Sequence, residues 1–305
     1  MLRLYKTQTN GLNKILDNME TNDKLSLKER MENFRKLYDY TLPKRSYTMV
    51  MCDGRSFSKL IKNKFEKPFD EWFMRAMDIT AKYICENVQG AKFAYVQSDE
   101  ISVVVTDFDN EETEAFYGNR LCKLQSIIAS LATCKFNQLL TAKLIQDKMY
   151  ETTLMDTEDT IYKPIDCVNA IIGMQLIQFD CKAWNLPTFN DVYAWFLYRQ
   201  TDCIRNSKQQ TAQTYLPHKM LLGLDTDKQI ALLKEIKGID WNEFVDNKKY
   251  GRFIERREIE STVYNNYLKQ EMTVVKKEWI PGPAYYLKDN RERFENTSNI
   301  PIKDE

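Results

Sequence analysis

The chain has 305 residues, of which 43% are hydrophobic, 12% aromatic and 29% charged. So many apolar and aromatic residues exclude intrinsic disorder, and no apolar run is long enough to predict a membrane span or a membrane partner. The 44 Lys and Arg balance the 44 Asp and Glu, so net charge gives no general attraction to nucleic acid. The composition favours a globular enzyme that works in water.

Cysteine and histidine content narrows the possible chemistry. The seven cysteines are scattered and never at the spacing of zinc or redox motifs, which indicates free thiols in a reducing compartment. We expect the cytoplasm, with a mitochondrial location as the alternative. The single histidine, His218, leaves carboxylates as the candidate metal ligands, and all-oxygen sites suit Mg²⁺.

Hydrophobic periodicity in the first half predicts a charged helix and then the order strand, helix, strand, strand, helix. The charged helix spans residues 29–40, the strands 47–53, 92–97 and 101–106, and the two longer helices 69–89 and 112–140. This order is the split β-α-β-β-α unit of ferredoxin-like folds, with the last two strands joined as a hairpin.

The second half of the chain is less regular. Residues 146–164 form an acidic, irregular segment, 167–179 one or two strands that extend the sheet, and 189–205 and 225–237 helices. The predicted fold class is therefore α/β of the α+β type, an antiparallel sheet flanked by helices, with a helical C-terminal extension.

Two acidic turns are the strongest chemical signal. Asp53-Gly54 ends the first strand, and Ser98-Asp99-Glu100 forms the tip of the hairpin. An Asp-Gly turn alone is common. If the first strand lies beside the hairpin, however, Asp53 and Asp99 meet at one sheet edge, the layout of polymerase palms and nucleotidyl cyclases. Carboxylates placed in this way can bridge two metal ions, and Gly54 lets its carbonyl approach a cation closely.

Candidate phosphate-binding residues lie on one predicted helical face. Arg120, Lys123, Ser126 and Ser130 follow each other at steps of three, three and four residues. This face is either a solvated surface or a site for a triphosphate. Residues 56–59 offer backbone N–H groups after Asp53, and Lys67 offers a further charge.

The region after residue 190 combines aromatic and basic residues. Its aromatics, Tyr193, Trp195, Phe196 and Tyr198, are predicted to be core. Arg199, Arg205 and Lys208 beside them are candidates for nucleic-acid contacts, as is the basic patch 248–252. His218 is more simply read as a structural histidine.

The ordered set of motifs is specific. It comprises Cys52-Asp53-Gly54-Arg55-Ser56-Phe57, Lys67-Pro68-Phe69-Asp70, Tyr95-Val96-Gln97-Ser98-Asp99-Glu100-Ile101-Ser102, the Arg120 to Ser130 helix, Phe179-Asp180, Tyr198 to Ser207, His218-Lys219, residues 237–242 and Gly251-Arg252. Together, over about residues 28–252, they resemble the tRNA-His guanylyltransferase family, and more closely its guanylyltransferase-like branch of template-dependent 3′-to-5′ RNA polymerases.

The resemblance implies an enzyme that adds nucleotides to the 5′ end of tRNA. It implies a palm-like catalytic domain with an N-terminal helix, residues 1–206, and a mainly helical, RNA-contacting region packed on it, residues 207–305. Two Mg²⁺ ions would be held by Asp53, the Gly54 carbonyl and Asp99, with Glu100 as a supporting catalytic residue. ATP, GTP and other nucleoside triphosphates would be substrates, and the assembly a homotetramer.

The resemblance also implies further binding residues. Those for nucleotide or triphosphate are Arg55, Ser56, Phe57, Ser58, Lys59, Lys67, Ser98, Arg120, Lys123, Ser126 and Ser130. Those for RNA are Arg199, Arg205, Asn206, Ser207, His218, Lys219, Lys249 and Arg252.

The sequence departs from the eukaryotic guanylyltransferases at one motif. Ile204-Arg205-Asn206-Ser207-Lys208 stands where they have His-Ile-Asn-Asn-Leu-Tyr-Asn, which favours templated 5′-end repair over addition of one extra G to tRNA-His. A second departure is Leu216-Pro217 before His218, where relatives have Phe-Ser. Two other functions stay open: an RNA-binding palm without catalysis, and a cyclase or nucleotidyl transferase that uses no RNA.

Overall fold

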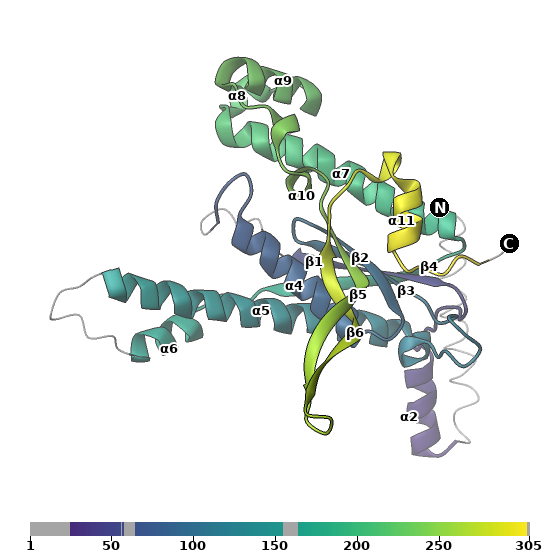
Figure 1. The fold of residues 1–305 in the computed structure, drawn as a ribbon. Helices are drawn as coiled ribbons and strands as arrows, with labels where there is room; N and C mark the ends of the chain where they lie inside the picture. The colour runs from purple at the N-terminus through teal and green to yellow at the C-terminus, as the bar shows by residue number, and fades with distance from the viewer. Residues whose placement is uncertain (1–24, 56, 58–64, 155–163, 304–305) are drawn as a thin grey trace.

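The computed structural model describes residues 25–55, 57, 65–154 and 164–303 (Figure 1). Its centre is a six-stranded, fully antiparallel sheet with the strand order β4-β1-β3-β2-β5-β6. The strands are β1 (Tyr47–Arg55), β2 (Ala91–Gln97), β3 (Glu100–Val105), β4 (Gln178–Leu186), β5 (Arg252–Asn265) and β6 (Gln270–Gly282).

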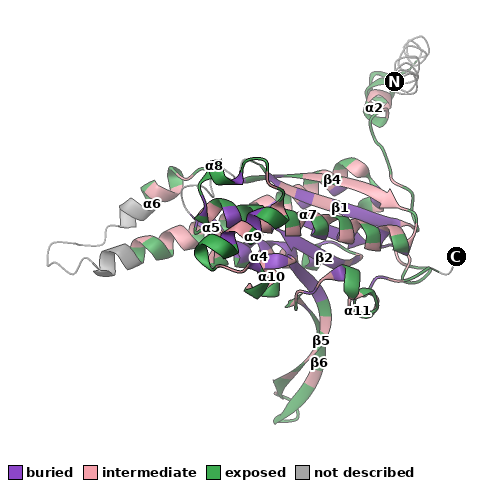
Figure 2. Ribbon diagram, turned by 90° about the horizontal axis from the view of Figure 1, so that it is seen from above, coloured by how far each residue is buried: buried purple, intermediate pink, exposed green. Residues whose placement is uncertain are grey.

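Helices cover both faces of the sheet because the central strands are apolar on both sides. On one face, α4 (Glu71–Asn87) and α5 (Leu121–Leu154) pack on residues such as Val50 and Val103. On the other face, α7 (Phe189–Tyr215) packs through Val192 and Phe196. Figure 2 shows buried residues concentrated in the central strands. The predicted β-α-β-β-α unit is confirmed as β1-α4-β2-β3-α5.

The start of α5 was predicted too early. Residues 110–113 form a hydrogen-bonded turn in which Asn110 Oδ1 accepts from the Glu112 amide and the Thr113 hydroxyl. A 3₁₀ turn, η2 (Phe116–Asn119), follows with left-handed backbone at Tyr117 and Asn119. The helix therefore begins only at Leu121.

The assignment of residues 167–179 as a strand was wrong. Residues from 164 form helix α6 (Pro164–Ile172), and the strand that extends the sheet, β4, comes later, beside β1. Short apolar runs do not distinguish helix from strand by periodicity. Helix α7 begins at the capping box of Thr188 and Asp191 and runs to Tyr215, so the predicted domain boundary at residue 206 falls inside one helix.

The C-terminal region has the predicted helices and also a β-hairpin that was not predicted from the sequence. It contains α8 (His218–Leu221), α9 (Thr226–Lys237), η3 (Trp241–Glu243), α10 (Asp246–Lys249), η4 (Leu287–Asp289) and α11 (Arg291–Thr297), but β5 and β6 occupy residues 252–282. The outer part of the β5–β6 hairpin is largely exposed (Figure 2). A separate apolar cluster joins the end of α7 to α8 and α9.

The N-terminal helix α2 (Leu27–Lys36) has no buried residue, and the capping box of Ser26 and Glu29 begins it. Among the described residues, no helix has the length and apolar character needed to cross a membrane.

Candidate active site

The two acidic turns meet at one edge of the sheet. β1 and β3 are antiparallel with Asp53 opposite Glu100, and the Gly54 amide donates to the Asp99 carbonyl over 3.1 Å. A left-handed backbone at Ser98 (φ 45°) makes the tight β2–β3 turn, and the Ser98 hydroxyl hydrogen-bonds to Asp99 Oδ1 over 2.9 Å. Asp53 and Asp99 therefore lie at the same edge of the sheet, as predicted.

A further carboxylate joins this edge from β4. Asp180 lies opposite Asp53 in the β1–β4 ladder, so Asp180, Asp53 and Glu100 occupy neighbouring positions across three strands. Residues directly opposite each other in a ladder share one face of the sheet. Asp180 belongs to the sequence motif Phe179-Asp180. Its place beside Asp53 was not predicted, because the strand was assigned to residues 167–179 and not to β4.

The pKa values of Asp53 and Asp99 are raised. Burial, followed by the charges of Asp99, Glu100 and Asp180, raises the pKa of Asp53 to about 6. Burial is also the main cause of a raised pKa at Asp99. An acid whose charged form is so disfavoured gains most from a nearby cation.

Glu100 is neutralised by an arginine from α7. Arg199 donates from Nε to Oε1 over 2.8 Å and from Nη2 to Oε2 over 2.5 Å, in the two-bond geometry that suits guanidinium and carboxylate. Both side chains are almost buried, at 13% and 11% exposed. Asp202, one turn further along α7, also contacts Arg199 at 3.3 Å. Arg199 thus faces the carboxylates, although the sequence suggested it for RNA.

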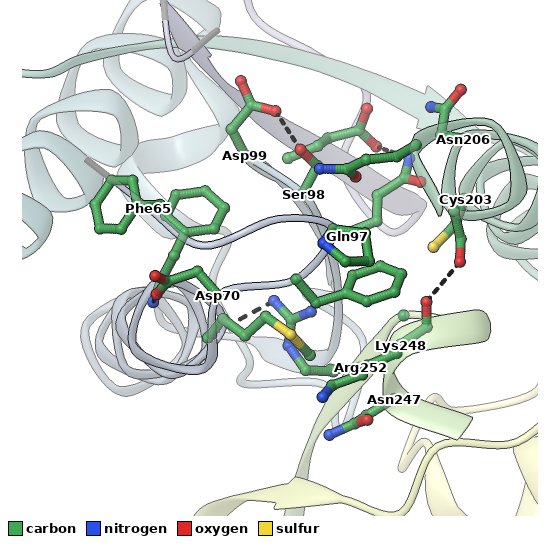
Figure 3. Close-up of a pocket in the computed structure, with 18 of the residues that line it drawn as sticks. Phe65, Asp70, Gln97, Ser98, Asp99, Cys203, Asn206, Asn247, Lys248 and Arg252 are labelled. Carbon is green, nitrogen blue, oxygen red and sulfur yellow. Dashed lines mark hydrogen bonds between the residues drawn. The ribbon is translucent and has the colours of Figure 1, made fainter. Parts of the chain in front are cut away.

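A cavity of about 300 Å³ opens beside the carboxylates (Figure 3). Three groups of residues form its walls. They are the β1 end and the β2–β3 turn (Asp53 and Gln97 to Glu100), the start of α4 with the segment before it (Phe65, Glu66, Pro68 to Asp70, Phe73 and Met74), and residues from α7 and the C-terminal region (Arg199, Cys203, Asn206, Ser207, Gln210, Asn247, Lys248, Gly251 and Arg252).

The walls of this cavity combine apolar rings with amides. Phe65 lies across the cavity from Asn206 and Asn247 (Figure 3), and Phe69 and Phe73 also line it. The Oδ1 atom of Asn247 is buried and has no hydrogen-bond partner. Apolar walls with a few convergent polar groups, in a volume of this size, are typical of sites for small ligands such as nucleotides.

Six residues between Asp53 and α4 were predicted to contact the nucleotide, and the structure places them differently. Phe57 is buried against Phe73, Phe136 and Phe179, so it is a core residue and not a ligand contact. Arg55 is exposed beside Gln178. Lys67 is exposed and does not line the cavity. Ser56, Ser58 and Lys59 lie outside the described residues.

The predicted cationic helix face does not meet the carboxylates within this chain. Arg120 precedes α5 and forms an exposed ion pair of 3.2 Å with Asp39. Ser126 and Ser130 are exposed along α5, and Lys123 is partly exposed. None of the four lines the cavity.

The predicted RNA contacts divide into exposed and buried groups. His218 and Lys219 are exposed on α8, and Arg205 is 63% exposed in an ion pair with Asp202. Asn206 lines the cavity.

Three of the predicted RNA contacts serve the fold. Ser207 accepts from Trp241 Nε1 over 2.9 Å and donates to the Lys248 carbonyl over 2.8 Å. Lys249 lies under Trp241 and pairs with Asp246, and Arg252 pairs with Asp78 at 2.5 Å. Lys249 and Arg252 are 9% and 7% exposed, so these cations are largely withdrawn from solvent.

The donor set at the sheet edge fits magnesium. Asp53, Asp99 and the Gly54 carbonyl offer oxygen atoms only, and burial together with the neighbouring carboxylates raises the pKa of Asp53. Among the described residues no group of three or more His, Cys, Asp or Glu is arranged as a metal site. Mg²⁺, which keeps several waters, is usually bound through one or two carboxylates.

Comparison with known proteins identifies the family of this chain. The family model for tRNAHis guanylyltransferase matches residues 28–187, more than half of the chain. An uncharacterized protein of Acanthamoeba polyphaga mimivirus is 29% identical over 247 residues, which are 78% of this chain and 80% of that protein.

Two solved structures are similar over nearly the whole fold. A bacterial tRNA(His) guanylyltransferase-like protein in complex with ATP is 29% identical, with a TM-score of 0.70, over 89% of this chain and 98% of its own. Such a protein in complex with GTP is 27% identical, with a TM-score of 0.63 and the same coverage.

Proposed function

The chain belongs to the tRNAHis guanylyltransferase family, whose members are nucleotidyltransferases that act on tRNA, and on this basis we propose that it adds nucleotides to the 5′ end of tRNA in a template-dependent, 3′-to-5′ direction. The biological task we assign to it is repair of tRNAs that lack 5′ nucleotides. Addition of a single G to tRNA-His is the second candidate.

The observation that carries the proposal is the position of Asp53 and Asp99 at the mouth of a nucleotide-sized cavity. A catalytically silent RNA-binding palm would gain nothing from Asp53, whose charged form is disfavoured by burial and by the neighbouring carboxylates. Relatives that bind ATP and GTP have the same fold, which supports a nucleoside triphosphate as the occupant. A cyclase without RNA would explain the acids, but not the match to a tRNA-modifying family.

The proposed reaction has two transfers. A tRNA 5′-monophosphate attacks the α-phosphorus of ATP, which forms an adenylylated 5′ end and releases pyrophosphate. The 3′-hydroxyl of an incoming nucleotide then attacks the activated 5′ phosphorus, forms the new phosphodiester and releases AMP. A tRNA that already carries a 5′-triphosphate needs only the second transfer, with pyrophosphate as the leaving group.

The residues of this chain have separate tasks in that reaction. Asp53, Asp99 and the Gly54 carbonyl would hold two Mg²⁺ ions, which offset phosphate charge and stabilise attacking and leaving oxygens when bound. Both oxygens of Glu100 accept hydrogen bonds from Arg199, so we assign Glu100 a supporting role and not a place among the metal ligands. Its pair with Arg199 instead fixes α7 against the catalytic edge. The phenyl rings and amides of the cavity orient one nucleotide.

We favour repair over addition of a single G because residues 204–208 depart from the motif of the eukaryotic guanylyltransferases. In α7, Ile204 packs toward the C-terminal cluster, Asn206 lines the cavity, and Ser207 is bound to Trp241 and Lys248. Ile204 and Ser207 hold the C-terminal helices in place, and Asn206 and Ser207 both line the cavity.

A 5′-extension assay tests the proposal. A tRNA lacking its first nucleotide, with a 5′-monophosphate or a 5′-triphosphate, is incubated with Mg²⁺, ATP and labelled nucleotides, and the nucleotide opposite the gap is varied. We expect the added nucleotide to complement the varied one. Addition of G alone, whatever the opposite base, selects the second candidate, and no extension of either substrate refutes both.

Two variants locate the chemistry in this assay. Asp53→Ala and Asp99→Ala should each abolish extension without loss of tRNA binding, because they remove metal ligands and no cation. Asp147→Asn, an exposed carboxylate on α5, is the matched control and should extend normally. We also propose a homotetramer, which light scattering of the intact protein tests directly.

A further inference from the structure

Two cysteines face each other on neighbouring strands beside the active site. Cys52 on β1 lies opposite Cys181 on β4. The next pair of the same ladder is Asp53 and Asp180, so the cysteines sit one residue from the catalytic edge. Figure 2 shows β4 running alongside β1 at the border of the sheet. These two cysteines are far apart in the chain, and only the pairing of β1 with β4 brings them together.

The ladder geometry brings the two side chains close together. The Gly54 amide donates to Asp99, so Gly54 points its backbone polar groups toward β3. Alternate residues of a strand point the same way, so Cys52 also points toward β3 and forms a non-hydrogen-bonded pair with Cys181. In such pairs the Cα atoms are about 4.5 Å apart, within the range of about 4.4–6.8 Å that disulfides accept.

The Cys181 side chain lies close enough to Cys52 to raise the pKa of the Cys52 thiol, together with burial. Cys52 is completely buried, whereas Cys181 is partly exposed on the edge strand. An oxidant in solution therefore reaches Cys181 first, and Cys52 is the residue placed to react with it next.

We propose that Cys52 and Cys181 form a reversible disulfide when the protein meets a peroxide, and that closing it slows nucleotide transfer. The Cys181 thiolate attacks one peroxide oxygen, the O–O bond breaks, and hydroxide leaves, to be protonated to water. The Cys52 sulfur then attacks the resulting sulfenic acid and displaces a second water. Two thiols lose two electrons to one hydrogen peroxide, and a dithiol reductant reverses the change.

The expected effect on the reaction follows from the distances. Opposite Cβ atoms in a ladder are about 4.5–5.5 Å apart, and a disulfide draws them to about 3.8 Å. β4 must then move toward β1 beside Asp53, and a displacement of about 1 Å at reacting groups can cost about 100-fold in rate. Only this effect on rate rests on the proposed function; formation of the disulfide does not.

The experiment treats the full-length protein with hydrogen peroxide, alkylates the free thiols and maps the peptides without reduction. We expect a linked Cys52–Cys181 peptide, a fall of about 10-fold or more in 5′-extension, and recovery of both by dithiothreitol. ATP affinity, measured by calorimetry on the same samples, replaces extension as the second readout if the reduced protein proves inactive on tRNA.

Variants separate this pair from other oxidation. Cys181→Ser and Cys52→Ala should form no linked peptide and should keep their activity in peroxide. Cys134→Ser removes an exposed cysteine on α5 and should behave like the unaltered chain. Absence of the linked peptide overturns the proposal, as does equal inactivation of Cys181→Ser, or a disulfide that changes neither extension nor ATP affinity.

Discussion

The Arg199–Glu100 pair makes the most direct stability prediction. Arg199→Met keeps most of the apolar stem but leaves Glu100, which is 11% exposed, without its guanidinium partner. Two charged hydrogen bonds are lost, at 2.8 and 2.5 Å, and removal of one member of a buried pair costs about 3–5 kcal/mol. Because a few exposed atoms stay hydrated, we expect the lower end, about 3 kcal/mol.

Urea unfolding of the unaltered chain and the variant measures this difference. Arg205→Met is the control: it lies one and a half turns further along α7, is 63% exposed and pairs with Asp202, so it should lose no more than about 1 kcal/mol. Glu100→Gln added to Arg199→Met should recover part of the loss, since no buried charge is then left. A loss below about 1 kcal/mol for Arg199→Met, or equal losses for the two arginine variants, would refute this reasoning.

Three further predictions concern the catalytic edge. Gly54→Ala should destabilise the protein by about 1–3 kcal/mol, seen as a lower melting temperature, because the new Cβ would lie 2.2 Å from the Phe57 ring. The pKa of Asp53 rises from 3.8 to about 6 on folding, so its ionisation destabilises the fold as pH rises through this window. Asp53→Asn in a chelator should therefore be more stable than the unaltered chain by about 1–2 kcal/mol above pH 6, because solvent screens part of the repulsion at this half-exposed carboxylate, with no difference below pH 4. Equal stabilities at pH 7 would contradict the raised pKa of Asp53. Asn247→Ala should leave the melting temperature unchanged, because its Oδ1 has no partner, but should raise the KM for the incoming nucleotide about 5–10-fold; an unchanged KM would remove Asn247 from the nucleotide site.

The sequence predicts the parts of the site that depend on local order along the chain. Asp53 and Asp99 follow from where apolar strands end and from the short hairpin between β2 and β3. The partner of Glu100 does not follow, because Arg199 reaches it only after α7 has packed on the sheet. Phe57 was assigned to nucleotide because of its motif, but an aromatic side chain beside an apolar core is buried there.

The largest error of the fold prediction concerns the β5–β6 hairpin. Its outer strands carry charged and apolar residues with little burial on either face, so they lack the alternation by which a half-buried strand is recognised. The α6–β4 region failed for a different reason, since its apolar residues suit either a short helix or a strand.

Helix α7 gives the molecule a mechanical property. Its 27 residues, about 40 Å of continuous helix, carry Phe196 in the cluster under the sheet and Ala212 in the cluster with α8 and α9. Arg199 lies between these two anchor points and holds Glu100. A ligand that displaces α8 and α9 would therefore tilt α7 as a rigid helix. Because Arg199 on α7 holds Glu100, the tilt would shift the carboxylates at the sheet edge.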